Sequence, residues 1–186
     1  MFLKVQFFLI CIFLASSITT FAQGDVEWLS FEEAIEMQKV DRKKIVIDIY
    51  TEWCIYCKRM DKATFQKEHI SDYINSNFYP VKLDGEQKKD ITFGGQTYKY
   101  VKNGARGYHE LAVALTEGRL SYPTVIFLDE DLKIIQGIPG YRSPMEFEMI
   151  MSYFGENHHK NMPWSKYQEN YVPIRVKNRK VKMTGN

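Results

Sequence analysis

The chain has 186 residues, of which 45% are hydrophobic and 26% are charged, and its formal net charge is +2 at pH 7. This length suits about one globular domain, and near-neutrality argues against nucleic acid as the main partner. With only three cysteines, the fold does not depend on a framework of disulfides.

The first 22 residues have the three-part form of a secretory signal peptide. Lys4 precedes an apolar run over residues 5–15, and residues 20–22 place small side chains at the processing positions. The run is short for a membrane span, and a retained N-terminal anchor is the alternative. We expect residues 1–22 to be removed and the protein to be periplasmic or otherwise exported, with no stable membrane insertion afterwards. Removal leaves 164 residues (186 minus 22) and only two cysteines, Cys54 and Cys57.

The first half of the mature chain predicts alternating helices and strands. Ser30 and Glu33 have the spacing of a capping box, which predicts a helix over residues 31–39. The apolar run at residues 45–50 predicts a strand that is interrupted only by Asp48. A strand that is apolar on both faces belongs in the middle of a covered sheet, so we expect Asp48 to be buried. The segments that follow are predicted as helices over 58–65 and 70–74 and a strand over 78–83.

The composition then becomes charged and glycine-containing, which predicts an insertion over about residues 85–107. Inside it, Gly94-Gly95 is the expected centre of a tight hairpin over residues 91–98. An amphipathic pattern over residues 108–115 predicts a helix that Gly118 ends.

The last predicted elements are a hairpin and a helix. Apolar runs at residues 125–128 and 133–137, joined by a short acidic turn, predict antiparallel strands. Ser143 and Glu146 form a second capping-box pattern, which predicts a helix to residue 154 with Gly155 as its terminator. A parallel early half and an antiparallel late half make a mixed sheet flanked by helices, an α/β sandwich. We assign residues 23–155 to this domain and residues 156–186 to a C-terminal extension.

The two remaining cysteines suit redox chemistry. A cysteine at the start of a helix has its thiolate stabilised by unpaired backbone N–H groups. Cys54 comes first and is the expected attacking thiol. Cys57, one helical turn later, is placed to resolve the mixed disulfide.

Two charged residues near the pair are candidates for supporting roles. A buried carboxylate has a raised pKa, so Asp48 is expected to exchange a proton with Cys57. The alternative is an aspartate that a nearby lysine or backbone group satisfies. Lys58 adds positive charge beside the cysteines, or is an ordinary solvated helix residue.

Taken together, these residues resemble the thioredoxin superfamily over about residues 26–155. The resemblance is carried by the buried acid Asp48, the segment Trp53-Cys54-x-x-Cys57-Lys58 and the later segment Tyr122-Pro123-Thr124. It implies a thioredoxin-like three-layer sandwich with an inserted hairpin. It also implies a cis peptide bond at Pro123 beside the sulfurs, and a substrate-binding surface that includes Trp53, Tyr122 and Thr124, with the Tyr122 backbone pairing with an extended substrate segment.

The chain departs from thioredoxin in its Ile55-Tyr56 dipeptide, its insertion and its extension, and in these respects is similar to exported bacterial thioredoxin-like proteins. Because Ile55-Tyr56 offers no histidine to stabilise a Cys54 thiolate, a reductase is favoured over a strong oxidant. The predicted function is a thiol-disulfide oxidoreductase of exported proteins. The alternatives are an oxidase or isomerase, and a non-catalytic binding module that uses the inserted hairpin and the extension.

No cofactor is expected beyond the redox-active Cys54–Cys57 disulfide. The predicted partners are protein thiols and disulfides and an electron donor that the sequence does not name. A metal site is not expected, because only the two cysteines have a ligand-like spacing and a structural zinc ion takes about four ligands.

Overall fold

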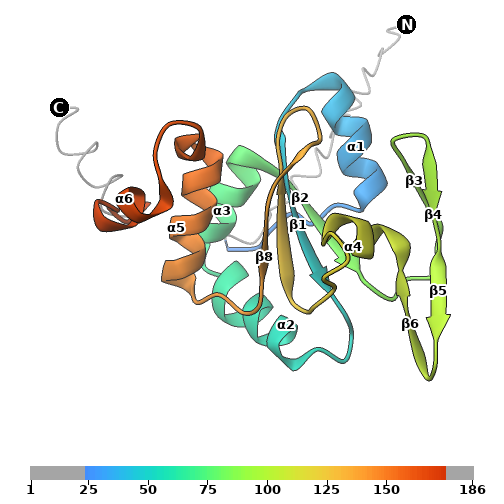
Figure 1. Cartoon of the computed structure of the whole chain (residues 1–186). Helices are drawn as coiled ribbons and strands as arrows, with labels where there is room; N and C mark the ends of the chain where they lie inside the picture. Colours follow the sequence, from blue (N-terminus) through green and yellow to red (C-terminus); the bar gives the residue numbers. More distant parts are fainter. Residues whose placement is uncertain (1–23, 175–186) are drawn as a thin grey trace, which may run out of the picture.

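The computed structural model describes residues 24–174, and the expected signal peptide lies outside them. A four-stranded mixed sheet in the order β2-β1-β7-β8 is the centre of the fold (Figure 1). Its strands are β1 (Lys44–Tyr50), β2 (Phe78–Asp84), β7 (Thr124–Leu128) and β8 (Ile134–Pro139). β1 pairs in parallel with β2 and antiparallel with β7, and β7 pairs antiparallel with β8. The predicted mixed sheet is confirmed.

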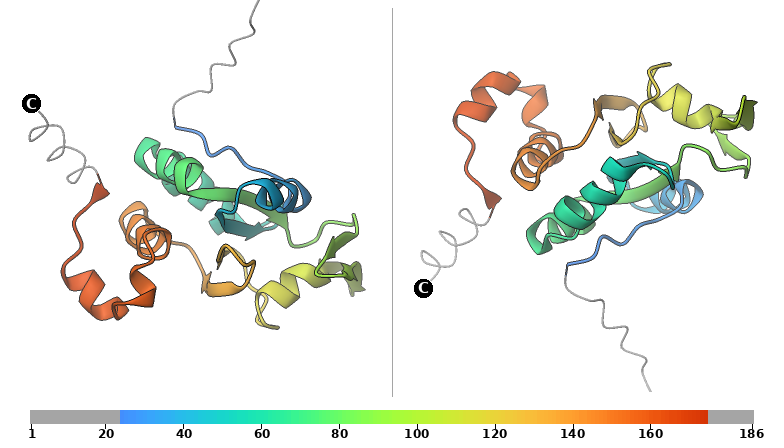
Figure 2. Two further views of the ribbon diagram at one scale, coloured as in Figure 1. Left: turned by 90° about the horizontal axis from the view of Figure 1, so that it is seen from above. Right: turned by 90° about the horizontal axis from the view of Figure 1, so that it is seen from below.

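Helices cover both faces of this sheet, so the domain has three layers (Figure 2). One face packs on α2 (Ile55–Met60), a π-helix at Asp61–Phe65, α3 (Glu68–Asn77) and α5 (Pro144–Gly155). The other face packs on α1 (Phe31–Val40) and α4 (Glu110–Leu115). Alternation along β1 directs Ile45, Ile47 and Ile49 to the α1 face. Asp48 therefore points to the α2 face, where the cysteines lie.

The insertion forms two hairpins, one more than the sequence predicts. β3 (Ile91–Phe93) and β4 (Gln96–Tyr98) form the predicted hairpin around Gly94-Gly95. β5 (Tyr100–Asn103) and β6 (Arg106–His109) form the second (Figure 1). Gly104 permits its tight turn, because its φ of +62° is in the left-handed region.

Several helix boundaries differ from the prediction, for example α3, which runs from Glu68 to Asn77, and two of the differences have a clear structural reason. The helix expected from residue 108 begins at Glu110, because Tyr108 and His109 complete β6 and the His109 side chain accepts a bond from the Leu111 N–H. Gly155 is the last residue of α5 and not its terminator. Glycine suits the close packing there, since a Cβ atom would lie 2.6 Å from the Tyr73 hydroxyl oxygen and would displace that side chain. The left-handed turn comes later, at Asn157, with a φ of +61°.

The described part of the extension packs on α5, through η2 (His158–Lys160) and α6 (Trp164–Glu169) (Figure 1). The buried Glu148 carboxylate on α5 accepts bonds from the Tyr171 hydroxyl and the Ile174 N–H, both at 2.7 Å. Its other oxygen lies 2.9 Å from His69 Nε2 on α3. One carboxylate therefore ties α3, α5 and the extension together.

Within residues 24–174, no helix is both long enough and apolar enough to span a membrane.

Replacing Glu148 by alanine is expected to lower the free energy of unfolding by about 3 kcal/mol, because buried partners of a charged group lose their bonds. Urea denaturation followed by circular dichroism measures this. Glu169→Ala is the matched control, because Glu169 is exposed at the end of α6. Equal stability of the two variants would contradict the anchoring role of Glu148.

Candidate active site

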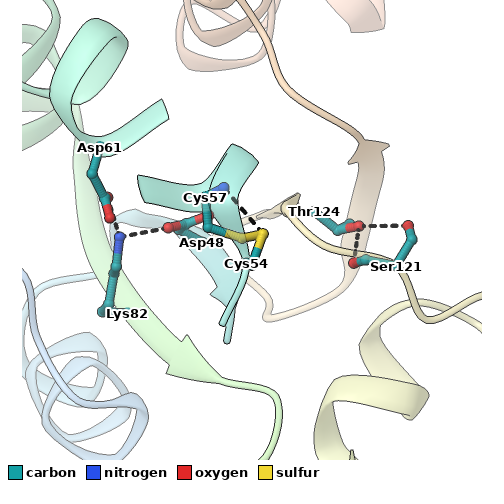
Figure 3. Close-up of a disulfide and its surroundings, with 7 residues drawn as sticks. All are labelled: Asp48, Cys54, Cys57, Asp61, Lys82, Ser121 and Thr124. Atoms are coloured by element: carbon teal, nitrogen blue, oxygen red, sulfur yellow. Dashed lines mark hydrogen bonds and ion pairs between the residues drawn. A yellow bond between two sulfur atoms is a disulfide. The ribbon is translucent and has the colours of Figure 1, made fainter. Parts of the chain in front are cut away.

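The cysteine pair lies between the carboxyl end of β1, an inner strand of the sheet, and the first turn of α2. The Cys54 N–H donates to the Thr51 carbonyl at 3.0 Å, which turns the chain after β1. Cys54 is the N-cap of α2, and its Sγ accepts a bond from the Cys57 N–H at 3.0 Å. The two cysteines form a disulfide with their Cα atoms 5.3 Å apart (Figure 3). A backbone donor aimed at Cys54 Sγ favours negative charge on that sulfur, which suits the predicted attacking thiol.

Beneath the disulfide, Asp48 is paired with a lysine from the neighbouring strand. β1 and β2 place Asp48 opposite Lys82, and the Lys82 ammonium lies 2.7 Å from Asp48 Oδ2. Asp48 is 1% exposed, and its second carboxylate oxygen has no hydrogen-bond partner among the described residues. Figure 3 shows Asp48 between Lys82 and the cysteine pair. Burial raises the pKa of Asp48 to about 6, and the attraction of Lys82 opposes this rise.

Lys82 is shared between two carboxylates. Asp61 begins the π-helix that continues α2, and its side chain also contacts the Lys82 ammonium. The rings of Trp28, Tyr50 and Phe65 surround the ammonium, with centroids 4.8, 5.0 and 5.5 Å away. The negative charge of Asp61 raises the pKa of Asp48 further. The site therefore holds one cation between two acids under the disulfide.

Lys82 and Asp61 were missed in the sequence analysis. Lys82 is the one charged residue inside the apolar stretch of residues 78–83. Pairing the two predicted strands in parallel would have placed it beside Asp48. Asp61 gives no comparable signal, because an acid on a helix that follows two cysteines usually lies in solvent.

The loop before β7 forms a second wall of the site. The Tyr122–Pro123 peptide bond is cis, as the family resemblance implies. The Thr124 hydroxyl donates to the Ser121 carbonyl at 2.8 Å, and the Pro123 carbonyl accepts from the Gly140 N–H at 2.7 Å. No backbone hydrogen bond within residues 24–174 involves the Tyr122 peptide groups. They are free to pair with an extended substrate strand.

The Tyr122 side chain packs into the protein. Its ring meets Trp53 edge-on, with centroids 5.8 Å apart. It also covers Gly85, where a Cβ atom would lie 2.4 Å from the hydroxyl oxygen. Burial raises the pKa of the Tyr122 hydroxyl to about 12, so it is neutral at physiological pH.

The surface around the disulfide is apolar and open. Trp53 is 46% exposed, Ile55 79% and Tyr56 60%. Lys58 is also exposed, and its ammonium makes no ion pair in the part of the chain that the structure describes. Over residues 24–174, no three His, Cys, Asp or Glu side chains are grouped so as to hold a metal ion.

Comparisons with known proteins find relatives over part of the chain. The chain is 29% identical over 98 residues to spermatogenesis-associated protein 20 of Mus musculus, covering 52% of this chain and 12% of that protein. It is 28% identical over 68 residues to the disulfide bond reductase DsbH of Chlamydia pneumoniae, covering 36% of this chain and 41% of that one. The chain thus spans less than half of the length of either relative.

A solved structure of a DsbH oxidoreductase has the same fold. Its TM-score is 0.51 at 19% identity, over 71% of this chain and 85% of that one. The family model of the thioredoxin-like domain matches residues 31–155, which include the cysteine pair, Asp48, Lys82 and the cis-proline loop. The chain therefore belongs to the thioredoxin-like domain family.

Proposed function

We propose that this protein is a thiol-disulfide reductase of exported proteins. The observation that carries the proposal is a Cys54–Cys57 pair at a helix start, above the buried Asp48 and beside a cis-proline loop. The name of the Chlamydia pneumoniae relative, a disulfide bond reductase, supports the direction. Export rests on the signal-peptide form of residues 1–22.

The reaction proceeds by two exchanges. The Cys54 thiolate attacks one sulfur of a substrate disulfide, forming a mixed disulfide and releasing the first substrate thiolate, which takes a proton from water. Cys57 then gives its proton to the Asp48 carboxylate and attacks Cys54 Sγ, which forms the Cys54–Cys57 disulfide and releases the second substrate group as a thiolate. That thiolate takes up a proton, which Asp48 returns directly or through water. A dithiol electron donor returns two electrons and two protons to the pair. No bound cofactor is needed, because the pair itself carries both electrons.

The side chains and donors around Cys54 support the reducing direction. A strong oxidant holds its thiolate with extra positive charge or hydrogen bonds, which stabilises the reduced form. Here Ile55 and Tyr56 are exposed and uncharged, and Cys54 Sγ has one backbone donor, the Cys57 N–H, among the described residues. This supports a modestly stabilised Cys54 thiolate and, with it, a reducing dithiol.

The two cysteine variants are expected to fail at different steps. Cys54→Ser should lose reduction of insulin disulfides, because the attacking thiol is gone. Cys57→Ser should still attack and then accumulate a mixed disulfide, visible on a non-reducing gel and by mass spectrometry. If both variants reduced insulin at the wild-type rate, the proposed reaction would be wrong, and the binding-module alternative would be favoured.

Closure of the mixed disulfide should depend on the ionisation of Asp48. The carboxylate accepts a proton only when ionised, so the rate should rise with pH through about 6, the pKa of Asp48. Asp48→Asn should lose this rise in rate with pH, the limb of the pH–rate profile near pH 6, and should slow closure at pH 7 by about 100-fold. Stopped-flow tryptophan fluorescence in single turnovers measures the rate. Asp72→Asn, which changes an exposed acid on α3, is the control. A limb near pH 6 that persists in Asp48→Asn would exclude the proton-acceptor role.

The two residues around Asp48 should move the same limb in opposite directions. Asp61→Asn removes a charge that raises the pKa of Asp48, so the midpoint should fall to lower pH. Lys82→Met removes the cation that lowers this pKa, so the midpoint should rise. The same stopped-flow titration measures both. Shifts in the same direction would show that the three side chains do not act as one charged group.

A further inference from the structure

The second inserted hairpin reaches the active site, although it lies 46 to 55 residues after Cys54 in the sequence (100−54 and 109−54). Arg106, the first residue of β6, stacks on Trp53, with its Cζ atom 3.9 Å from the ring centroid. Trp53 directly precedes the attacking cysteine. The insertion therefore places a cation against the side chain of the residue before Cys54.

The base of this hairpin is tied to the domain at several points. His109, at the end of β6, is fully buried, and its N–H donates to the Gly85 carbonyl at 2.7 Å. Its ring Nε2 lies 3.1 Å from the Lys89 carbonyl oxygen. Gly85 in turn lies under the Tyr122 ring, next to the cis-proline. The hairpin is thus held against the same loop that is expected to pair with substrate.

The guanidinium of Arg106 has unused hydrogen-bonding capacity. Its side chain is exposed, and within residues 24–174 it makes no hydrogen bond and no ion pair. An arginine carries five N–H donors in a planar fork that matches a carboxylate. The contact with the Trp53 ring is a cation–π contact and not a hydrogen bond to a protein acceptor, so these donors remain available to a ligand.

The other charges around the site show whether an anion would bind beside Tyr122 or beside Arg106. Asp84 and Glu86 lie near the Tyr122 hydroxyl and raise its pKa, so the floor beside Tyr122 is acidic. Glu52 adds to the acidic field at Asp84. A substrate carboxylate would be repelled there and attracted at Arg106. Of the two exposed cations near the pair, Lys58 and Arg106, the one that lies over Trp53 comes from the hairpin.

We propose that Arg106 selects disulfide substrates whose polypeptide carries an acidic side chain close to the reacting cysteine. This inference rests on the proposed function and names its substrate class. The substrate cysteine lies at Cys54, its backbone pairs with the Tyr122 peptide groups, and the acidic side chain accepts hydrogen bonds from the Arg106 guanidinium, which Trp53 keeps in place.

The test compares peptide disulfides that differ in one charge. Symmetric disulfide dimers of short Gly/Ser peptides carry Glu, Gln or Lys at the residue before or after a single cysteine, and the reduced protein is mixed with each at low ionic strength. The second-order rate constants are measured by acid quenching and chromatography of the released peptide thiols. In at least one of the two peptide series, with the variable residue before or after the cysteine, the wild type should reduce the Glu peptide about fivefold faster than the Lys peptide. This is the range of an exposed ion pair.

Variants of the hairpin identify the source of the preference. Arg106→Gln should abolish it and Arg106→Glu should reverse it. Lys102→Gln removes one exposed positive charge from the same hairpin and should keep it. Glu and Lys peptides reduced within twofold of each other by the wild type, or a preference that survives in Arg106→Gln, would overturn this inference and leave the reductase proposal standing. A wild type that reduces none of the peptides would overturn both.

Discussion

The buried charge of Asp48 is the constraint on which the site depends. A carboxylate inside a covered sheet costs several kcal/mol unless a partner compensates, and β2 supplies that partner as Lys82 at the opposite position of the parallel pair. The compensation is incomplete, because one oxygen of Asp48 has no hydrogen-bond partner among the described residues and Asp61 competes for the same ammonium. Burial therefore keeps the pKa of this carboxyl at about 6, beside the cysteine pair (Figure 3).

The sequence predicted the parts of the fold that depend on local pattern. Apolar runs and capping boxes located the core strands and the main helices, and the polar interruption at Asp48 correctly indicated a buried acid. Lys82 and Asp61 lie 34 and 13 residues from Asp48 along the chain (82−48 and 61−48). Their meeting depends on strand register and on the π-helix that follows α2, which no local periodicity records.

The insertion was only half predicted, for a similar reason. Gly94-Gly95 is a local turn signal, whereas β5 and β6 are short polar strands whose pairing depends on the buried His109 and on the tight turn at Gly104. The spacing of Tyr108 and Leu111 suited a helix equally well. As a result, the contact between Arg106 and Trp53 could not be predicted from the sequence and was found only in the structure. It gives the insertion a place at the site and not only on the surface.

The reduction potential of the Cys54–Cys57 couple tests the central claim most directly. Equilibration in dithiothreitol or glutathione buffers, followed by alkylation of free thiols, measures it. A weakly stabilised Cys54 thiolate predicts a reducing couple, near the value of about −270 mV typical of thioredoxin. A potential near about −120 mV, typical of a strong oxidant, would contradict the proposed reductase, because it would mean that the reduced form is strongly stabilised.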